Sequence, residues 1–320
     1  MTCWMRDWPT AYPRPEGPWT VRRQDLGGHQ IEWGAFYPEA GTVVALVPEA
    51  DEALPGIGAA LQRGRLVGYR RGRRAVVATP TSFVKVVRPR RVESLVSCHD
   101  LLADCPFAVP HVLDVTADGS VELSALTGVS LHQQLRADPS CSVDSVGAVV
   151  AALHTQPLPD RLRVAGVDDP QQWVAISRRA STSHLATIER TASMLPPVEV
   201  RAEVVVHGDL HDKNIFVDRP GLIDLDGLGL GAPEDDLANL AVHLELRNLQ
   251  AGTGLAPGAR SEQLYRAHRQ AWTGRPLDPE RLRQVEQHTW FRLACLSQYR
   301  AGSRRLVPRM LNAALTTPGP

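Results

Sequence analysis

A short β-type interruption in the otherwise helical second half of the chain constrains the fold most. After residue 128 the apolar residues recur mainly at helical spacing, yet residues 203–226 show the pattern of three short strands with a polar loop and a tight turn between them. The loop lies in the stretch VVVHGDLHDKNIF at 204–216 and holds two His, two Asp, a Lys and an Asn between apolar flanks. Such a loop is either a hydrated turn or a device that holds catalytic groups at fixed separations.

The spacing of apolar residues and turn formers divides the chain into two parts. Residues 1–126 are mostly β-type, with short runs of β-branched residues between Gly and Pro turns and one helix expected over 90–104. Residues 1–30 show no periodicity, so we expect an irregular leader there. Residues 127–320 are mainly helical. The sequence therefore predicts an α+β protein with a β-rich N-terminal lobe at 1–126 and a helical C-terminal lobe at 127–320.

Local signals place several elements within these lobes. Asp-Pro pairs at 169–170 and 278–279 predict helix starts, because Asp caps a helix N-terminus and Pro suits the first turn. Asp118-Gly119 predicts the turn of a hairpin within 111–126. Residues 65–89 are expected to form three strands.

The composition suggests neither nucleic acid nor a membrane as a partner. The 320 residues carry a formal net charge of zero, and no apolar run approaches the roughly 18 residues that cross a bilayer. The first residues hold acids and prolines where a signal peptide needs an apolar stretch. Five scattered cysteines without a CxxC pair favour reduced thiols, so we expect a cytoplasmic protein. These features leave the oligomeric state open.

One segment is strongly basic. Ten basic residues and no acid lie between 61 and 92, which is consistent with phosphate attraction, nucleic-acid binding or an Arg-rich solvated surface. Tyr69 and Phe83 are the aromatic residues there, too few for a surface that stacks bases. We therefore favour the solvated surface.

Lysine is rare in this chain. Of 35 basic residues, 33 are Arg, and the two Lys are Lys85 and Lys213. Lys is a compact point charge, whereas Arg is a planar fork that needs more room. The two positions either require an ammonium group or have kept Lys by chance.

The polar loop has a spacing suited to phosphoryl transfer. Asn214 lies five residues after Asp209, and Asp224 follows a short hairpin whose open end returns to Asn214. A carboxylate can accept or orient the proton of the acceptor, while an amide oxygen and a second carboxylate hold Mg²⁺ on nucleotide phosphates. Such a reaction asks the protein mainly for positioning and charge neutralisation.

With these motifs the sequence resembles the aminoglycoside phosphotransferase and choline kinase-like family, which has a two-lobed protein-kinase-like fold. HGDLHDKN, LIDLD and DDLANL are similar to the family pattern HGDxHxxN, hIDh and DLA, where h is apolar. In the same order, TSFVKVV offers a strand lysine, ELSALTG stands where the hinge between lobes is expected, and LHTQP follows the next helix. The resemblance covers residues 65–245.

The resemblance implies a role for each matching residue of the second lobe. Asp209 is implied to be the catalytic base, and Asn214 and Asp224 are implied to bind magnesium. His207 is implied to support the loop, and Asp236 to brace it from the next helix.

In the first lobe, the resemblance implies that Lys85 reaches the α- and β-phosphates of the nucleotide. A helix carboxylate is expected to pair with it. We assign Glu93, with Asp100 on the same face of the helix as the alternative. The hinge residues Ala125 and Leu126 are implied to contact adenine through their backbone.

Several positions depart from the family pattern or allow two interpretations. No GxGxxG motif is present; Gly72 stands at the expected turn, and phosphate contacts there come from backbone NH groups or from nearby Arg. Lys213 either neutralises the transferred phosphoryl group or points to solvent. His207 and His211 have a spacing that suits zinc only on a helix, which Gly208 argues against. Asp226 is a second metal contact or, as we favour, a strand-end residue.

The implied activity is transfer of the γ-phosphate of ATP or GTP, with Mg²⁺, to a hydroxyl of a small molecule such as an antibiotic, sugar or amino alcohol. A polycationic aminoglycoside would need carboxylates around its site, and residues 168, 169, 234 and 235 offer them. From residue 282 onward, however, the chain has six Arg and one acid. A neutral or anionic acceptor is therefore at least as well supported.

Two other functions are less consistent with the sequence. A non-catalytic nucleotide-binding module, a pseudokinase, is disfavoured because Lys85, Asp209, Asn214 and Asp224 are all present. A protein kinase is disfavoured because Asp236 follows Asp224 by only twelve residues, too few for a peptide-docking segment.

Overall fold

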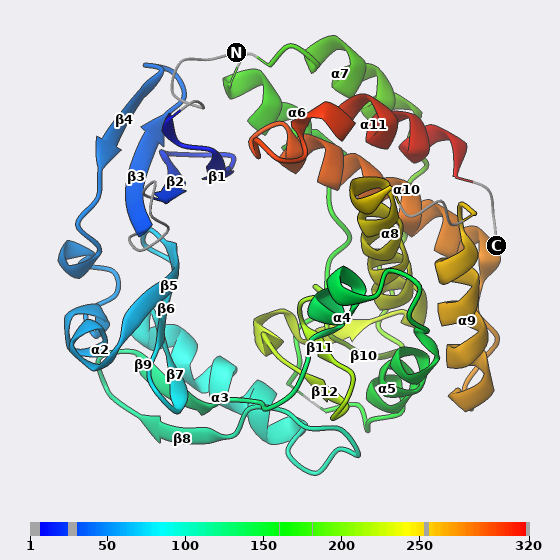
Figure 1. The fold of residues 1–320 in the computed structure, drawn as a ribbon, viewed down its shortest axis with the longest axis horizontal. Helices are drawn as coiled ribbons and strands as arrows, with labels where there is room; N and C mark the ends of the chain where they lie inside the picture. The colour runs from blue at the N-terminus through cyan, green and yellow to red at the C-terminus, as the bar shows by residue number, and fades with distance from the viewer. Residues whose placement is uncertain (1–6, 25–30, 160, 181, 253–255, 318–320) are drawn as a thin grey trace.

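Strands occupy the first part of the chain and helices the second, as the spacing of apolar residues predicts (Figure 1). The computed structural model describes residues 7–24, 31–159, 161–180, 182–252 and 256–317. The predicted α+β class is confirmed. Among the described residues, no helix is both long and apolar enough to cross a membrane.

A five-stranded antiparallel sheet follows residue 64, with the strand order β5-β6-β7-β9-β8. Val84 and Val86 face one side of the sheet, and Lys85 between them faces the other, because successive strand residues alternate. The predicted three strands and the hairpin are all present. The strands are β5 (Arg65–Arg70), β6 (Arg74–Ala78), β7 (Ser82–Val87), β8 (Val112–Val115) and β9 (Ser120–Ser124).

Helices cover both faces of this sheet. Helix α2 (Ile57–Arg63) packs with Trp33 on the face that carries Val84. Helix α3 (Val92–Leu101), which lies within the predicted helical segment, packs on the opposite face through Leu95. Lys85 lies on this second face and is only 5% exposed.

The leader is not irregular, so that expectation is wrong for its described part. Strands β1 (Thr10–Tyr12) and β2 (Trp19–Gln24) continue into β3 (Ile31–Tyr37) and β4 (Thr42–Ala45) as an antiparallel sheet, hereafter the first sheet. Residues 1–6 and 25–30 lie outside the described part of the chain. The short strands gave no periodic signal because their apolar side chains pack on distant residues.

The first sheet joins the two lobes on the side away from the linker. Trp33 packs edge-on against Tyr69 of β5, with 5.5 Å between ring centroids. Toward the helices, the N–H of Ala11 donates to the carbonyl of Tyr299 (3.1 Å), and the N–H of Ala301 donates to the carbonyl of Pro9 (3.0 Å). Figure 1 shows the result, a ring in which the first sheet lies between the five-stranded sheet and the far helices.

The C-terminal part is built from helices whose starts follow the predicted caps. Asp169 and Asp278 accept backbone N–H groups at the first turns of α6 and α10, and Ser130 forms a capping box at α4. The helices are α4 (Leu131–Ala137), α5 (Asp144–His154), α6 (Pro170–Arg179), α7 (Leu185–Met194), α8 (Pro233–Ala251), α9 (Ala259–Ala271), α10 (Pro279–Ser297) and α11 (Val307–Thr316). Short 3-10 turns lie at η1 (Pro48–Ala50), η2 (Pro89–Arg91), η3 (Leu225–Gly227) and η4 (Arg304–Leu306).

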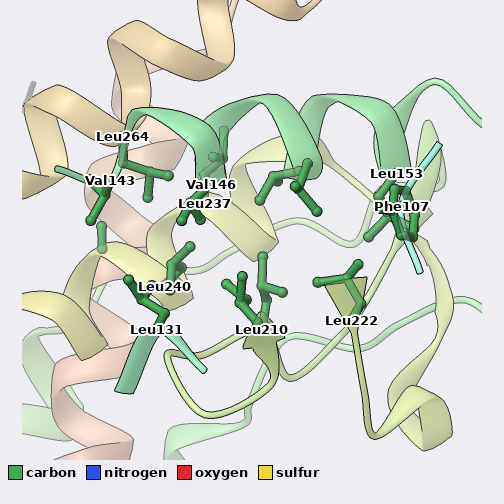
Figure 2. Packing of buried hydrophobic residues seen from close by; sticks show 14 of the residues in the cluster. Phe107, Leu131, Val143, Val146, Leu153, Leu210, Leu222, Leu237, Leu240 and Leu264 are labelled. Atoms are coloured by element: carbon green, nitrogen blue, oxygen red, sulfur yellow. The ribbon is translucent and has the colours of Figure 1, made fainter. Parts of the chain in front are cut away.

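The largest core lies between α5, α8 and the β interruption. Val146 of α5 lies next to Leu237 of α8, Leu153 lies next to Phe107, and Leu210 and Leu222 of the interruption pack beneath them (Figure 2). Leu210 sits inside the polar loop and is fully buried. The loop is therefore anchored in the core although most of its side chains are polar.

The β interruption forms two short pairs. Strand β10 (Val204–Val206) pairs with β13 (Gly229–Gly231), and β11 (Ile215–Phe216) pairs with β12 (Gly221–Leu222). The polar loop runs from β10 to β11, and Asp224 follows β12 after one residue, Ile223. This arrangement brings the two ends of the motif together.

Candidate active site

One buried carboxylate holds the start of the polar loop. Asp236, in the first turn of α8 and 1% exposed, accepts the N–H of His207 (2.7 Å) and the N–H of Gly208 (3.0 Å). Nε2 of His154 lies 3.3 Å from the same carboxylate. Burial by itself would raise the pKa of Asp236, but His154 and the His207 N–H outweigh it, and the pKa lies below its ordinary value. Asp236 therefore makes the contacts expected of a residue that braces the loop.

His207 connects the loop to the strand that precedes Asp224. Its Nε2 lies 2.9 Å from the carbonyl oxygen of Ile223, an acceptor, so Nε2 carries the proton. Nδ1 then accepts the N–H of Asp209 (3.4 Å). Both ring nitrogens are occupied by backbone groups, an arrangement that leaves neither for a zinc ion.

Gly208 is required by the geometry of the loop. Its φ is +76°, and a Cβ added there would lie 2.4 Å from the carbonyl oxygen of Gly227. No side chain fits that space without moving backbone. The close approach sets the path of the chain into Asp209.

Asp209, Asn214 and Asp224 meet at the open end of the hairpin. The side-chain amide nitrogen of Asn214 donates to the Asp209 carbonyl (3.1 Å), and the N–H of Ile223 donates to the Asn214 carbonyl (3.0 Å). Asp224 adopts left-handed backbone angles, φ 60° and ψ 54°. The Asp209 side chain is exposed and faces a cavity that Asp224 also lines.

These residues offer a set of oxygen atoms that fits Mg²⁺. Because the amide nitrogen of Asn214 is engaged by Asp209, its Oδ1 points away and receives no donor among the described residues. Asp224 adds a carboxylate at the same hairpin end. Carboxylate and amide oxygens together with nucleotide phosphates and water are the ligands that Mg²⁺ prefers.

Two cations of the five-stranded sheet reach the carboxylates that follow β12. The Nζ atom of Lys85 lies 2.8 Å from Oδ1 of Asp224 and also bonds Asp226. Arg74 lies 3.2 Å from Asp224 and 2.7 Å from Asp226. Burial would raise the pKa of Asp224, yet Lys85 and Arg74 hold it well below its ordinary value. The four charges link the two lobes.

The structure does not bring Glu93 to Lys85. Glu93 is exposed in the first turn of α3 and lines a separate shallow depression with Val115 and Thr116. Asp100, the alternative, is exposed as well. The partners of Lys85 are Asp224 and Asp226, so the expected helix carboxylate is replaced by Asp226. Sequence reasoning undervalued Asp226, although its spacing of two from Asp224 was a usable signal.

Arg74 was missed entirely. Nothing in an Arg-rich segment distinguishes one arginine from the next, but strand register does. Arg74 is paired with Val87, and Val76 with Lys85, so Arg74 and Lys85 lie on the same face of the sheet. Register could have identified Arg74 once the turn at Gly72 was placed.

The linker residues expected at the hinge lie between β9 and α4. Ala125 is exposed and Leu126 is half-buried. Among the described residues, the backbone groups of Ala125 and Leu126 have no hydrogen-bond partner. Their geometry leaves these backbone groups available to a ligand.

A cavity of about 760 Å³ lies between the lobes and is unusually rich in arginine. Eight arginines line it, against the carboxylates of Glu16, Asp209, Asp224 and Asp226. The volume is within the range of small-molecule sites. The lining arginines are Arg14, Arg70, Arg73, Arg74, Arg88, Arg90, Arg91 and Arg163.

The turn at Gly72, beside this cavity, has no free backbone amide. The N–H of Arg71 donates to Thr20 (3.0 Å), that of Gly72 to Asp51 (2.7 Å), and that of Arg73 to the carbonyl of Arg70 (2.9 Å). The turn is thus fixed to the first sheet and to η1. Only its side chains remain to contact a ligand.

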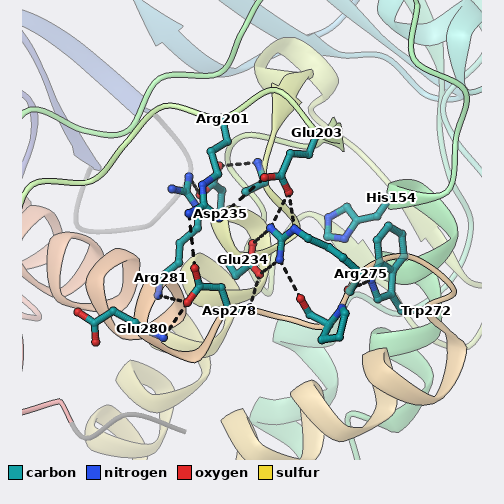
Figure 3. A network of polar contacts seen from close by, with 12 residues as sticks. His154, Arg201, Glu203, Glu234, Asp235, Trp272, Arg275, Asp278, Glu280 and Arg281 are labelled. Carbon is teal, nitrogen blue, oxygen red and sulfur yellow. Dashed lines mark hydrogen bonds and ion pairs between the residues drawn. The ribbon is translucent and has the colours of Figure 1, made fainter.

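The acids considered for a cationic acceptor are engaged elsewhere. Glu234 is fully buried and bonds Arg275, and Asp235 bonds Arg281 (Figure 3). Asp168 pairs with Arg292 at 2.7 Å, and Asp169 caps α6. Each of these carboxylates already has a protein partner.

The sequence and the fold are similar to those of known phosphotransferases and kinases. The sequence profile of the phosphotransferase enzyme family matches residues 58–285. Aminoglycoside phosphotransferase APH(3'')-Id from Streptomyces rimosus is 22% identical, with a TM-score of 0.51 over 76% of this chain and 96% of its own. A choline/ethanolamine kinase family protein from Mesorhizobium loti is 16% identical, with a TM-score of 0.53 over 82% and 95%.

Choline kinase LicA from Streptococcus pneumoniae is 12% identical, with a TM-score of 0.51 over 81% of this chain and 98% of its own. No curated protein matches the sequence. The structural likenesses confirm the predicted two-lobed protein-kinase-like fold.

Proposed function

The chain belongs to the phosphotransferase enzyme family, and on that premise we propose that it is a small-molecule kinase that transfers the γ-phosphoryl group of ATP or GTP to a hydroxyl. The supporting observation is the meeting of both lobes at one cavity. Lys85 and Arg74 come from the sheet, Asp224 follows the hairpin, and Asp209 faces the same space. Phosphoryl transfer needs these charges in one place.

The residues of the chain have distinct tasks in this reaction. Asp209 accepts the proton of the acceptor hydroxyl while the oxygen of that hydroxyl forms a bond to the γ-phosphorus. The bond from the γ-phosphorus to the bridging oxygen breaks, and the nucleoside diphosphate leaves. Lys85 and Arg74 neutralise charge on the phosphates, and His207 and Asp236 keep the loop in position.

Asn214 and Asp224 are proposed to hold Mg²⁺, which when bound neutralises phosphate charge. Guanidinium groups take the place of the amide-rich glycine loop, because the amides around Gly72 are already bonded within the protein. The backbone of Ala125 and Leu126 is proposed to hold the base.

The test is release of ADP or GDP with Mg²⁺ over a mixed pool of hydroxylated small molecules. Wild type is compared with Asp209→Asn, which keeps the shape and removes the base, and with Asp104→Asn. Asp104 is exposed, and its side chain forms no hydrogen bond or ion pair with the described residues, so it serves as the matched control. We expect acceptor-dependent turnover in wild type and Asp104→Asn, and a loss of roughly a hundredfold or more in Asp209→Asn.

Two results would count against the proposal. Equal turnover in Asp209→Asn and wild type would remove Asp209 from catalysis. Tight nucleotide binding without phosphorylated product from any acceptor would favour the pseudokinase.

A further inference from the structure

Two arginines from different parts of the chain lie within electrostatic reach of Asp209, the proposed base. Arg70 ends strand β5, and Arg300 lies just after α10. Asp209 acts on the pKa of each of them as a nearby negative charge. Yet within the described part of the chain, neither guanidinium forms an ion pair with a carboxylate. Both arginines are thus half-buried and have no carboxylate partner among the described residues.

The first sheet holds both arginines in place. Thr10 of β1 forms an antiparallel bridge with Arg300, which fixes the backbone there. Tyr12, two residues further along β1, lies under Arg70, whose guanidinium carbon is 4.9 Å from the ring centroid. Neither Tyr12 nor Arg300 lines the large cavity, whereas Arg70 and Asp209 do. Strand β1 therefore connects Arg300, through Thr10 and Tyr12, to Arg70, which lines the cavity together with Asp209.

Further cationic side chains lie within electrostatic reach of the group formed by Tyr12, Arg70 and Arg300. The pKa of Arg300 is lowered first by burial and then by the charges of Arg292 and Arg247. Burial and the charge of Arg74 similarly lower the pKa of Arg70. Lys213 lies within electrostatic reach of Arg300 and of Arg22 on β2. A half-buried cation without a counter-ion is destabilising, and a bound anion would relieve that cost.

The nucleotide alone does not balance this charge. The cavity lining has eight arginines against four carboxylates, and a nucleoside triphosphate with its Mg²⁺ carries roughly two net negative charges. Arg300 and Lys213 add to the surplus from outside the lining. The carboxylates able to hold a cationic acceptor are paired with Arg275, Arg281 and Arg292.

Part of this group lies outside the region that the family profile matches. Tyr12 and Arg300 lie outside residues 58–285, the part that matches the family profile. Arg300 follows the matched region, and Tyr12 belongs to the first sheet, which precedes it.

We propose that the acceptor is a hydroxyl compound that also carries a phosphate or carboxylate group, and that Arg70 and Arg300 bind this group beside Asp209. The proposal rests on the proposed phosphotransferase function and narrows it to anionic acceptors. Bidentate guanidinium contacts suit both phosphate and carboxylate. With the anion fixed there, the hydroxyl of the acceptor is presented to Asp209.

The test measures binding of inorganic phosphate to the full chain with ADP and Mg²⁺ saturating the nucleotide site, by isothermal titration calorimetry. Wild type is compared with Arg300→Gln, Arg300→Lys and the control Arg305→Gln, an exposed arginine five residues further on. We expect phosphate binding in wild type and Arg305→Gln. It should be roughly tenfold or more weaker in Arg300→Gln, with partial recovery in Arg300→Lys.

A kinetic arm distinguishes the sources of the anion. Glycerol 3-phosphate, glycerate and glycerol are offered as acceptors, and transfer to either anionic compound but not to glycerol identifies the preferred group. Unchanged thermal unfolding midpoints in the Arg300 variants would show that they fold.

The proposal is overturned if phosphate fails to bind while ADP and Mg²⁺ do, or if Arg300→Gln and Arg305→Gln bind it equally. Either result leaves the kinase function standing. Failure of ADP and Mg²⁺ to bind would instead reject the kinase function itself.

Discussion

The Nζ atom of Lys85 lies 2.8 Å from Oδ1 of Asp224, although 139 residues separate the two along the chain. The contact joins the third strand of the five-stranded sheet to the turn that follows β12. Arg74 and Asp226 complete the cluster, so two cations face two carboxylates. The cluster couples the stability of the site to its charge state.

The first prediction concerns pH. The pKa of Asp224 is lower in the folded protein than in the unfolded chain, so near pH 4 the unfolded chain binds more protons at this residue. Its stabilising contribution is therefore complete above the unfolded pKa and is lost as pH falls toward the folded value. Between about pH 5 and 3, we expect the free energy of unfolding to fall more in wild type than in Lys85→Met. The difference between the two decreases should be about 1 kcal/mol.

Urea denaturation at a series of pH values measures this difference. Arg65→Met, an exposed residue on β5, is the control and should keep the wild-type slope. Identical slopes in wild type and Lys85→Met would show that Lys85 does not set the pKa of Asp224.

The second prediction concerns Asp236, which holds the start of the polar loop. Asp236→Asn replaces one of two carboxylate oxygens by an NH₂ group that opposes an N–H of His207 or Gly208. We expect a loss of about 2–4 kcal/mol in unfolding free energy together with a large fall in turnover. Asp235→Asn, in the same turn but bonded to Arg281, should lower stability less and keep turnover. Equal turnover in both variants would argue against a bracing role.

The third prediction concerns Gly208. Alanine there combines a left-handed backbone with a contact of 2.4 Å to the Gly227 carbonyl oxygen. At Gly252, φ is +62° and a Cβ meets nothing within 4 Å, so alanine costs only the backbone strain, roughly 1–2 kcal/mol. Chemical denaturation should show Gly208→Ala to be less stable than Gly252→Ala by about 1 kcal/mol or more. Similar losses would mean that the loop relaxes around the added methyl group.

The fourth prediction concerns the first sheet. Trp19 is fully buried, 4.8 Å from the ring of Tyr299 and 5.6 Å from that of Phe36. Trp19→Ala should reduce the free energy of unfolding by about 3–5 kcal/mol, because it leaves a large cavity. It should also speed hydrogen exchange at the Ala11 and Ala301 amides, which mass spectrometry can localise. Unchanged exchange there would show that the sheet and the helices dock independently of Trp19.

Features that depend on neighbouring residues were the ones the sequence predicted well. The strands around the polar loop, the hairpin at Asp118-Gly119 and the helix starts after Asp169 and Asp278 all depend on local turn and capping chemistry. The loop that carries Asp209 and Asn214 is of the same kind, since a short hairpin returns the chain to Asp224.

Features decided by distant contacts were missed. The partner of Lys85 lies across the lobe boundary, so the nearby Glu93 was preferred on sequence grounds. Strand β1 has only three residues, and its backbone bonds reach residues 299–301 at the other end of the chain. No local sequence pattern predicts such a strand, because most of its apolar contacts are with residues that are distant in the sequence.

The first sheet also changes how the two lobes can move. Lobes joined by a single linker open by hinge rotation about that linker. Here residues 125–130 join the lobes at one edge, while the Ala11–Tyr299 and Ala301–Pro9 bonds fasten them at the other. Opening about either edge strains the contacts at the opposite edge, so rotation of the lobes about the linker is restrained. Lobes attached at both edges can still twist and slide relative to each other. Ligands have to enter and leave the cavity by means of these motions.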